Sequence, residues 1–360
     1  MHQQDQSNTH TANKEVMLQP MRFPCLLLCI LFLFGAATVV HAATDSLGGG
    51  RARPAPEAGP TPVKIGFFIL DLSRVDDVLQ EFVIDFRLEA RWYDSRVVSV
   101  DEAPARAGEM LPLEEVWHPS LTIVNQRRIW PRFPEQVVIQ SDGSLAYGQR
   151  YYGTFAAPLD LREFPLDEQV VRIVTGSKRY GVDELEILPF DPLMGSLGES
   201  TLPNWKVGEG RFESTTIGIP SFGTQFAAAI YAIPLKRGSG YFIWKVVLPL
   251  CLIVTMSWAV FWIDPRELGS QLGLSASAVL TLVAFQWSLG QFLPRVSYMT
   301  TLDHFLIVSM LFVFLALAEA ITSTRLARGD HLEVAVRLDR TCRILFPVSF
   351  CAIVSFIFLF

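Results

Sequence analysis

The residue types that most often carry enzyme chemistry are scarce between Ala43 and Gly240. This segment contains one histidine, His118, inside a Trp-His-Pro motif, and no cysteine. A single histidine provides neither a metal-ligand cluster nor a Ser/His/Asp triad, and the chain has no phosphate-binding glycine loop. We therefore expect an enzyme to be excluded, with no catalytic residue, no metal and no cofactor, and we interpret His118 as a packed residue at the end of a strand.

Carboxylates gather in one short stretch of the same segment, "PLDLREFPLDEQVV" from Pro158 to Val171. It holds four acidic residues, one aromatic residue and two prolines. A loop of this composition usually needs a covalent staple, and an exported domain would be free to form one. Because no cysteine lies near this loop, we expect packing alone to hold it together.

The N-terminal region has the features of an export signal. Arg22 precedes an apolar run from Pro24 to Val40, and Val40-His41-Ala42 fits a small-residue cleavage site. We expect a signal peptide over residues 1–42 and a flexible Gly/Pro-rich linker over residues 43–62. The alternative is an uncleaved transmembrane anchor.

The next segment has the pattern of β-strands. In "EFVIDFRLEARW", which starts at Glu81, apolar side chains recur at every second position, which predicts a strand. The turn dipeptide Asp142-Gly143 separates two further strand-like runs. Many short strands separated by turns favour an immunoglobulin-like antiparallel β-sandwich. We assign residues 63–239 to this domain and expect it to be extracellular.

The chain after Gly240 is much more apolar. Half of all residues are hydrophobic, the mean hydropathy is +0.32 and the formal charge is −6. This is too apolar for a soluble protein of this length, and the charge suggests no nucleic-acid partner. A bilayer core needs roughly 20 residues of helix, so we assign residues 240–360 to a bundle of four transmembrane helices. The expected spans are about 241–263, 270–292, 302–324 and 341–360.

Basic residues orient these spans. Five arginines lie between the third and fourth spans, and the positive-inside rule makes this segment a short cytoplasmic loop. They are Arg325, Arg328, Arg337, Arg340 and Arg343. Inside the third span, Glu319 would be costly in lipid. Roughly 9 Å of helix rise separates it from Arg325, so its carboxylate could reach the interface, and its role stays open.

The second span carries a stripe of small and polar residues at intervals of three and four. These are Ser270, Gly273, Ser277, Thr281, Ala284, Ser288 and Gln291. Such spacing places them on one face of a helix. A face of this kind either packs tightly against another helix or lines an aqueous pore. One helix cannot enclose a pore, so the second interpretation requires an oligomer.

Six motifs, with their order and spacing, are similar to those of one family. They are "RWYDSRV" (91–97), "VWHPSLTIVNQ" (116–126), "DLREFPLDEQ" (160–169), "GSKRYGVDEL" (176–185), "YFIWKVVLPL" (241–250) and "LPRVSYMTTLD" (293–303). From about Val63 to Phe360 the chain resembles the pentameric ligand-gated ion channels, the Cys-loop receptor superfamily, in its bacterial form. The resemblance implies a homopentamer in a lipid bilayer that binds a small-molecule ligand between subunits and conducts monovalent ions. It also implies the bacterial inner membrane, with the ligand-binding domain and the C-terminus in the periplasm.

The resemblance gives the Pro158–Val171 loop a role. In animal relatives a disulfide closes this loop, and Ala157 and Val171 stand where those cysteines would be. The loop would press on the membrane domain, with Asp167 as a buried charge paired to Arg237. The alternative for Asp167 is an exposed turn carboxylate. The residues implied in coupling ligand binding to gating are Val75, Asp76, Phe164, Pro165, Asp167, Arg237, Pro294 and Tyr298.

The resemblance also assigns the pore. Its implied lining is Gly273, Ser277, Leu280, Ala284, Trp287 and Gln291, with Leu280 as the hydrophobic gate and Trp287 as the alternative gate. Local electrostatics gives the selectivity: the inner mouth carries Asp264 and Glu267 against a single Arg266 and is net acidic. Glu267, about one helical turn before Ser270, would therefore favour weak cation selectivity. Ser270 replaces a glutamate of cation-selective relatives, and the linker from Trp262 to Gly273 has the length seen in anion-selective relatives. An anion-selective channel is therefore the alternative.

The implied ligand pocket is net basic. The expected residues are Arg87, Glu89, Lys178, Arg179, Tyr180 and Phe222. Such a lining favours a carboxylate-bearing or zwitterionic ligand over a quaternary ammonium held by aromatic rings. Two alternatives stay open. The charges could be solvated surface groups, or the protein could be a receptor that binds ligand without conducting.

Overall fold

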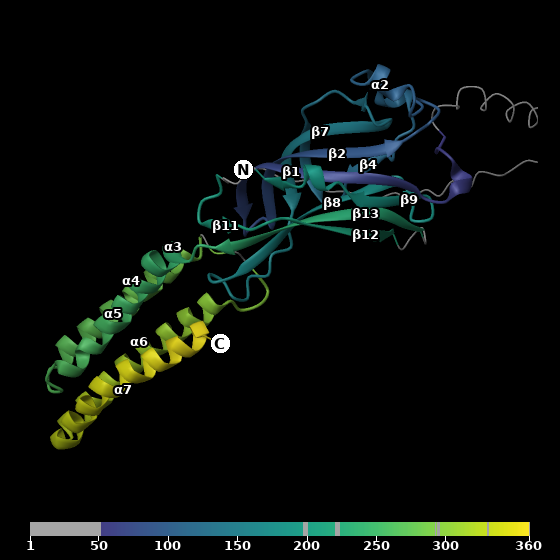
Figure 1. Ribbon diagram of the computed structural model, residues 1–360. Coiled ribbons are helices and arrows are strands. Elements are labelled where there is room, and N and C mark those ends of the chain that lie inside the picture. The colour runs from purple at the N-terminus through teal and green to yellow at the C-terminus, as the bar shows by residue number, and fades with distance from the viewer. Residues whose placement is uncertain are drawn as a thin grey trace, which may run out of the picture. The chain divides into compact units, whose positions relative to one another are not determined.

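The computed structural model of the chain describes six ranges of residues (Figure 1). These are 52–196, 201–219, 224–291, 293, 296–329 and 331–359. The expected signal peptide lies outside them, and so do Phe222 and Pro294. All the elements discussed below belong to one structural unit, Arg53–Phe360.

The first sheet is built around three long antiparallel strands, β1, β2 and β7, and has eight strands among the described residues. Along the sheet the order is β10-β1-β2-β7-β6-β3, with β9 also paired to β1 and β5 to β7. The strands are β1 (Thr61–Asp76), β2 (Glu81–Tyr93), β3 (Met110–Pro112), β5 (Gln126–Pro131), β6 (Gln136–Ile139), β7 (Ser144–Ala156), β9 (Leu185–Pro189) and β10 (Gly195–Ser196).

The second sheet has five strands in the described part of the chain, in the order β11-β13-β8-β4 with β12 paired to β13. Its members are β4 (Leu121–Ile123), β8 (Glu168–Gly181), β11 (Trp205–Val207), β12 (Arg211–Ile219) and β13 (Thr224–Arg237). A short helical turn, η1 (Pro56–Ala58), precedes β1, and three others lie between strands: α2 (Ala103–Arg106), η2 (Leu113–Glu115) and η3 (Asp191–Leu193). The strand-rich domain expected from the sequence is thus a two-sheet β-sandwich.

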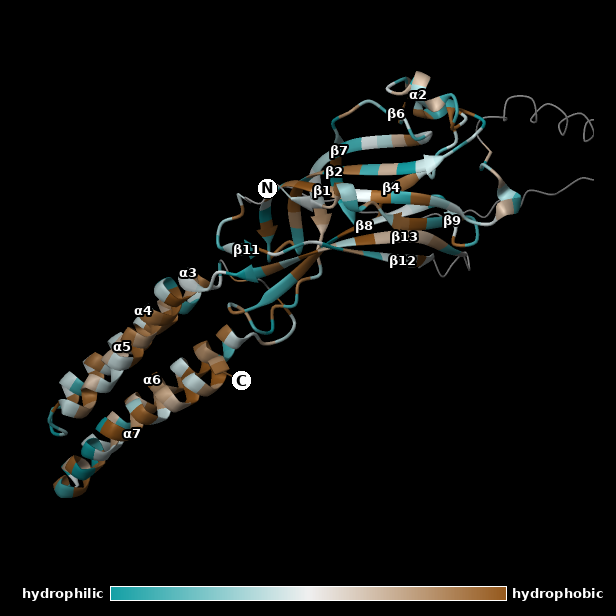
Figure 2. Cartoon of the chain, in the orientation of Figure 1, coloured by the Kyte–Doolittle hydropathy of each residue, from teal (hydrophilic) through white to brown (hydrophobic). Residues whose placement is uncertain are grey.

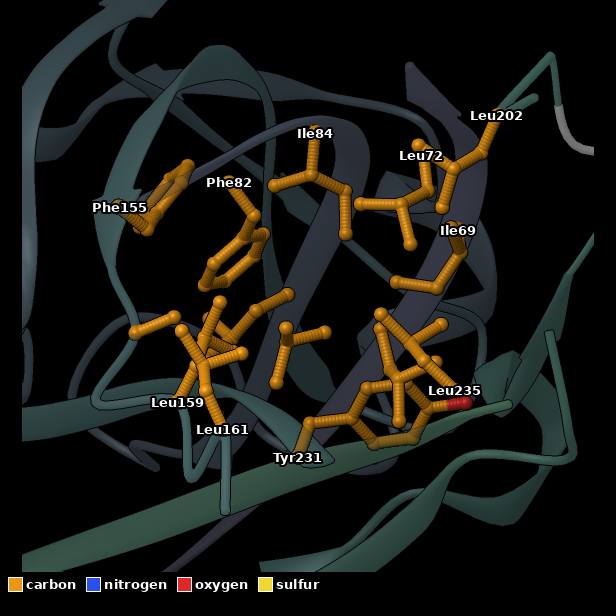
Figure 3. Close-up of a cluster of buried hydrophobic side chains, with 14 of the residues drawn as sticks. Ile69, Leu72, Phe82, Ile84, Phe155, Leu159, Leu161, Leu202, Tyr231 and Leu235 are labelled. Atoms are coloured by element: carbon orange, nitrogen blue, oxygen red, sulfur yellow. The ribbon is translucent and has the colours of Figure 1, made fainter. Parts of the chain in front are cut away.

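Alternation along the strands builds the core between the sheets. Phe67 of β1 stacks on Tyr231 of β13 at a ring distance of 5.2 Å, which joins the two sheets. Leu159 and Leu161, from the loop that follows β7, belong to the same buried cluster (Figure 3). Each aromatic pair of this kind contributes about 0.5–1.5 kcal/mol beyond area burial, so the sandwich is held by packing without a disulfide.

The predicted turn at Asp142-Gly143 is confirmed. It joins β6 to β7, and Gly143 has a φ of +80°, a conformation that glycine adopts without strain. The Asp142 Oδ1 atom accepts a hydrogen bond from the Ser144 backbone N–H at 2.9 Å, which fixes the turn.

Four helical segments are long and apolar enough to cross a membrane, as the sequence predicted (Figure 2). The first, Gly240–Trp262, is made of α3 (Gly240–Phe242), η4 (Ile243–Val247), α4 (Leu248–Trp258) and η5 (Ala259–Trp262). The others are α5 (Leu268–Leu289), α6 (Thr301–Arg328) and α7 (Leu332–Leu359). The chain is therefore a multi-pass membrane protein.

The arginine-rich segment was expected to be a loop over residues 325–343, and this expectation was wrong. The third helix continues to Arg328 and the fourth begins at Leu332. Good helix formers such as Leu, Ala, Arg and Glu fill this stretch, so the helices extend past the point at which hydropathy falls. The backbone N–H of Gly329 donates to the Arg325 carbonyl at 3.1 Å and ends α6.

Candidate functional site

A side-chain amide closes the loop between β7 and β8. The Gln169 Nε2 atom donates to the Asp160 carbonyl at 2.5 Å, and the Gln169 Oε1 atom accepts from the Asp160 backbone N–H at 3.1 Å. Gln169 is buried. Ala157 and Val171, at the positions that correspond to the disulfide cysteines of animal relatives, are buried as well. Hydrogen bonds therefore supplement the packing that the sequence predicted as the loop's sole support.

Arg237, the last residue of β13, lies between two carboxylates. Its Nε atom is 2.7 Å from Asp167 Oδ1, and its two terminal nitrogens are each 2.8 Å from an oxygen of Asp77. Asp167 and Arg237 are both buried. We call these three residues the Arg237 cluster. The predicted pairing of Asp167 with Arg237 is present, and Asp167 is not an exposed turn carboxylate.

Aromatic rings and charges together stabilise the guanidinium of Arg237. It lies 4.1 Å from the centre of the Trp205 ring and 4.9 Å from that of Phe164. Burial opposes its charge, but hydrogen bonds and attraction from Asp77 and Asp167 outweigh that effect and hold the pKa of Arg237 above its ordinary value. Arg237 therefore stays charged at any physiological pH.

Asp77 and Trp205 were missed by the sequence analysis, which selected Val75 and Asp76 in the turn between β1 and β2. The Asp76 carboxylate instead accepts hydrogen bonds from the backbone N–H groups of Val78 and Leu79 and fixes that turn. Val75 is partly buried against the core. Two adjacent acids in a hairpin turn are a weak signal, because only the fold shows which one faces Arg237.

The same loop bonds directly to the start of α6. The backbone N–H groups of Thr301 and Leu302 donate to the carbonyls of Arg162 and Phe164, at 2.8 and 3.1 Å. The Tyr298 hydroxyl accepts from the Leu161 backbone N–H at 2.9 Å. Because the first N–H groups of a helix have no partner within the helix, the loop supplies acceptors that the helix lacks.

The loop also touches the first membrane span. Phe164 packs edge-on against Phe242 of α3 with ring centres 4.7 Å apart, and the Phe164-Pro165 peptide bond is cis. Phe164 thus contacts Arg237 on one side and α3 on another. The arrangement forms an unbroken chain of contacts from β13 through the loop to α3 and α6.

One face of α5 is not covered by any of the described residues. The residues implied as the pore lining are all exposed: Gly273, Ser277, Leu280, Ala284, Trp287 and, just past the helix end, Gln291. Leu280 is 71% exposed and Trp287 is 77% exposed. The opposite face packs inside the bundle through Gln271, Ser275, Ala278 and Leu282. Large apolar side chains with no cover need either lipid, another subunit or a pore to face.

Acidic groups lie at the N-terminal end of α5. Glu267 is the residue that precedes the helix, and its carboxylate accepts a hydrogen bond from the Ser270 hydroxyl at 3.2 Å. A carboxylate at this end interacts favourably with the helix dipole. Glu267, Asp264 and Arg266 are all exposed, so each copy of the chain presents two acids and one base here.

The predicted ligand residues fall into two separate groups. On β2, the Glu89 carboxylate accepts from Arg87 at 3.0 Å and from Arg91 at 2.7 Å. Glu89 is buried and Arg87 is about half exposed. Two arginines around one glutamate leave this face of the strand net positive.

The second group lies on β8 of the other sheet. Lys178 and Arg179 are exposed, and Lys178 borders a cavity of about 440 Å³ whose lining does not include Arg87. Tyr180 was expected in the pocket, but it is buried and its hydroxyl accepts from Trp117 Nε1 at 2.9 Å. A single chain therefore does not bring Arg87 and Lys178 together, and Phe222 lies outside the described residues.

Comparisons with known proteins agree on one family. The family model described as "Neurotransmitter-gated ion-channel ligand binding domain" matches residues 49–194, and "Neurotransmitter-gated ion-channel transmembrane region" matches residues 246–331. Between them these two matches include most of the sandwich, α4, α5, α6 and the loop after β7.

Curated relatives include subunits of receptors named for gamma-aminobutyric acid. The beta subunit of Lymnaea stagnalis is 27% identical over 79% of this chain and 60% of its own length. The beta-4 subunit of Gallus gallus is 27% identical with the same coverage, and the beta subunit of Caenorhabditis elegans is 26% identical over 75% of this chain and 50% of its own length. The chain thus spans between half and two thirds of the length of these relatives.

Proposed function

We propose, on the premise that the chain belongs to the neurotransmitter-gated ion-channel family of Cys-loop receptors, that five copies form a ligand-gated ion channel. The observation that supports this most strongly is the uncovered face of α5. Five copies around an axis would turn Leu280 and Trp287 toward a common pore and away from the surrounding lipid. Native mass spectrometry of the purified protein should give a pentamer, and a monomer or dimer would contradict the assembly.

The proposed gating mechanism uses the contacts that run from β13 through the loop after β7 to α3 and α6. Ligand binding between two extracellular domains would shift the second sheet, in which β8 and β13 are paired along most of their length, relative to the first sheet. Because Arg237 ends β13 and Asp167 immediately precedes β8, that shift acts on the Arg237 cluster. Phe164 and the carbonyls bonded to Thr301 and Leu302 then pass it to α3 and α6. Helix α6 and helix α4, which continues the same span as α3, contact α5. There a ring of Leu280 side chains closes the pore by excluding water.

We propose a carboxylate-bearing or zwitterionic ligand, held between subunits by Arg87 of one copy and Lys178 of the next. The relatives named for gamma-aminobutyric acid, which is a zwitterion with one carboxylate, support this class. The net positive face of β2 supports it as well. We also propose that the protein lies in a bacterial inner membrane with its ligand-binding domain in the periplasm.

Arg87→Ala should separate acids from amines. Because a guanidinium binds a carboxylate with charge-assisted hydrogen bonds, loss of Arg87 should weaken the response to small organic acids by at least about tenfold, or about 1.4 kcal/mol. Responses to amines should change little, and the methyl esters of active acids should be inactive on the wild type. Concentration–response curves of ligand-evoked current measure this.

A matched control is Arg106→Ala, which removes an arginine on α2 outside the proposed pocket. It should leave all responses unchanged. Equal losses for acids and amines in Arg87→Ala would show that Arg87 acts through its bond to Glu89 instead of through the ligand.

We propose weak cation selectivity set by Glu267 at the inner mouth. With two acids and one base per copy, the mouth is net negative and attracts cations, although salt screens the effect within about 8 Å. In a salt gradient, the wild-type reversal potential should lie between zero and the equilibrium potential of the cation. Glu267→Gln should move it toward zero. Glu333→Gln, which neutralises an exposed acid at the start of α7, is the control and should cause no shift.

An anion-selective channel is the second candidate. The long linker between Trp262 and Gly273 and the absence of a glutamate at Ser270 favour it. A wild-type reversal potential near that of chloride would establish this candidate and reject ours. A cation-selective wild type with no shift in Glu267→Gln would support cation selectivity but show that Glu267 does not determine it.

A further inference from the structure

A group of polar side chains is buried among α5, α6 and α7. We call it the intramembrane polar cluster, and its members are Gln271, Ser275, Glu319, Ser323, Thr324 and Asp339. None is more than 9% exposed. The Glu319 carboxylate was expected to reach the interface, but its side chain is buried. Burying a carboxylate without a counterion is costly, so two buried carboxyl groups in one cluster need a physical reason.

The cluster is linked by short hydrogen bonds across the helices. The Ser323 hydroxyl donates to Asp339 Oδ1 at 2.7 Å, which joins α6 to α7. The Thr324 hydroxyl donates to Gln271 Oε1 at 2.7 Å, which joins α6 to α5. Glu319 lies one helical turn before Ser323 on α6, so its carboxyl group is on the face of α6 that meets Asp339 of α7.

No cation neutralises the two acids within the described residues. No Lys, Arg or His nitrogen there forms an ion pair with Glu319 or Asp339. Arg343, one turn after Asp339, donates instead to the Phe261 carbonyl at 3.0 Å and stacks over the Trp262 ring. The remaining ionisable neighbour on α7 is the thiol of Cys342. Helix α5 has no ionisable residue, and α4 has only Cys251.

Two oxygens in this region lack a hydrogen-bond partner. Glu319 Oε1 and Ser275 Oγ are buried without one. Helices α5 and α6 are joined at Gln271 and Thr324, so one turn along each antiparallel helix places Ser275 level with Ala320, next to Glu319. The site therefore has two adjacent carboxyl groups, and among the described residues Glu319 Oε1 receives no hydrogen bond from any donor.

We propose that Glu319 and Asp339 form a proton-binding site and hold one proton between them. One carboxyl group, when protonated, becomes an O–H donor to the other. The pair then carries one negative charge in place of two, which removes the repulsion between adjacent carboxylates. The Ser323 hydroxyl stabilises the charge that remains. The proton is exchanged with water, and no covalent step is involved.

This proton stabilises the contact between α6 and α7. When it is lost, two like charges face each other with no counterion, and the contact between the helices weakens. The neighbouring hydrogen bond between Thr324 and Gln271 connects this helix contact to α5. Alkaline pH should therefore loosen α7 from the bundle and alter the position of α5.

Infrared spectroscopy of the purified wild-type protein in phospholipid vesicles tests this without relying on conduction. At neutral pH the spectrum should contain the C=O stretch of a protonated carboxyl group, shifted in D₂O and lost on alkaline titration. Glu319→Gln and Asp339→Asn should each remove this band, because the amide then supplies the missing donor. Glu333→Gln, an exposed acid on the same α7 helix, should leave it intact.

Absence of the band in the wild type would overturn the proposal even if both variants failed to fold. A band that persists in folded Glu319→Gln would assign the proton elsewhere. Binding of sodium to the wild type, lost in both variants, would replace the proton by a metal cation. Failure of the channel function would change none of these results.

Discussion

Arg237→Gln should nearly abolish ligand-evoked current while the protein still assembles and reaches the membrane. The change leaves Asp77 and Asp167 facing each other without a counterion, and breaking a buried ion pair costs about 3–5 kcal/mol. The cost falls where the loop after β7 meets α3 and α6, away from the Phe67–Tyr231 core. It should therefore disturb transmission more than folding. Current recorded together with surface expression measures the two effects separately.

Lys236→Gln is the matched control for this prediction. Lys236 is the preceding residue, and it pairs with Glu168 at 2.8 Å, but both side chains are exposed. Exposed pairs contribute about 0–1 kcal/mol, so ligand-evoked current should stay close to wild type. Comparable losses in both variants would show that any charge change near this position is harmful, and that the Arg237 cluster has no special role.

A double-mutant cycle tests the pairing itself. Asp167→Asn combined with Arg237→Gln should cost less than the sum of the single changes, since the second change removes a charge that the first left unpaired. Asp77→Asn should couple to Arg237→Gln in the same way. Additive effects within about 0.5 kcal/mol would reject the pairing as the route of coupling.

Leu280→Ser should shift the apparent ligand sensitivity to lower concentrations by at least about tenfold, about 1.4 kcal/mol, or produce current without ligand. Closing the pore by dewetting depends on a ring of apolar side chains. Burying one leucine contributes about 1.5–3 kcal/mol, and the proposed ring contains a leucine from every subunit. A hydroxyl at each position would favour water and therefore the open state.

Leu311→Ser provides the comparison, because Leu311 is an exposed leucine on α6 and not on α5. It should leave gating unchanged. If Leu280→Ser also has wild-type gating, the hydrophobic gate is elsewhere. The exposed ring of Trp287, about two turns toward the C-terminal end of α5, then becomes the candidate.

Hydropathy and strand alternation predicted the two halves of the chain, because both depend on local sequence. The four spans and the two-sheet sandwich are present. The ends of the third and fourth spans were misplaced, since hydropathy detects the bilayer core while helix propensity extends α6 and α7 beyond it. The Asp167–Arg237 pair was predictable from the loop motif.

Residues that depend on distant partners could not be predicted in this way. Asp77 and Arg237 are in contact although 160 positions of sequence separate them. The proposed role of Glu319 depends on Asp339, which lies on the next helix. The amide of Gln169 closes its loop through backbone atoms, which leave no trace in residue type. The ligand pocket is the extreme case, since one chain places Arg87 and Lys178 on different sheets.

Single-channel recording from the purified protein in a planar lipid bilayer tests the central claim most directly. We expect discrete unitary currents that appear or change in frequency with a small organic acid, and that are present without ligand in Leu280→Ser. Specific binding of that acid to a folded pentamer with no unitary current under any condition, including in Leu280→Ser, would contradict the channel and leave a receptor that does not conduct.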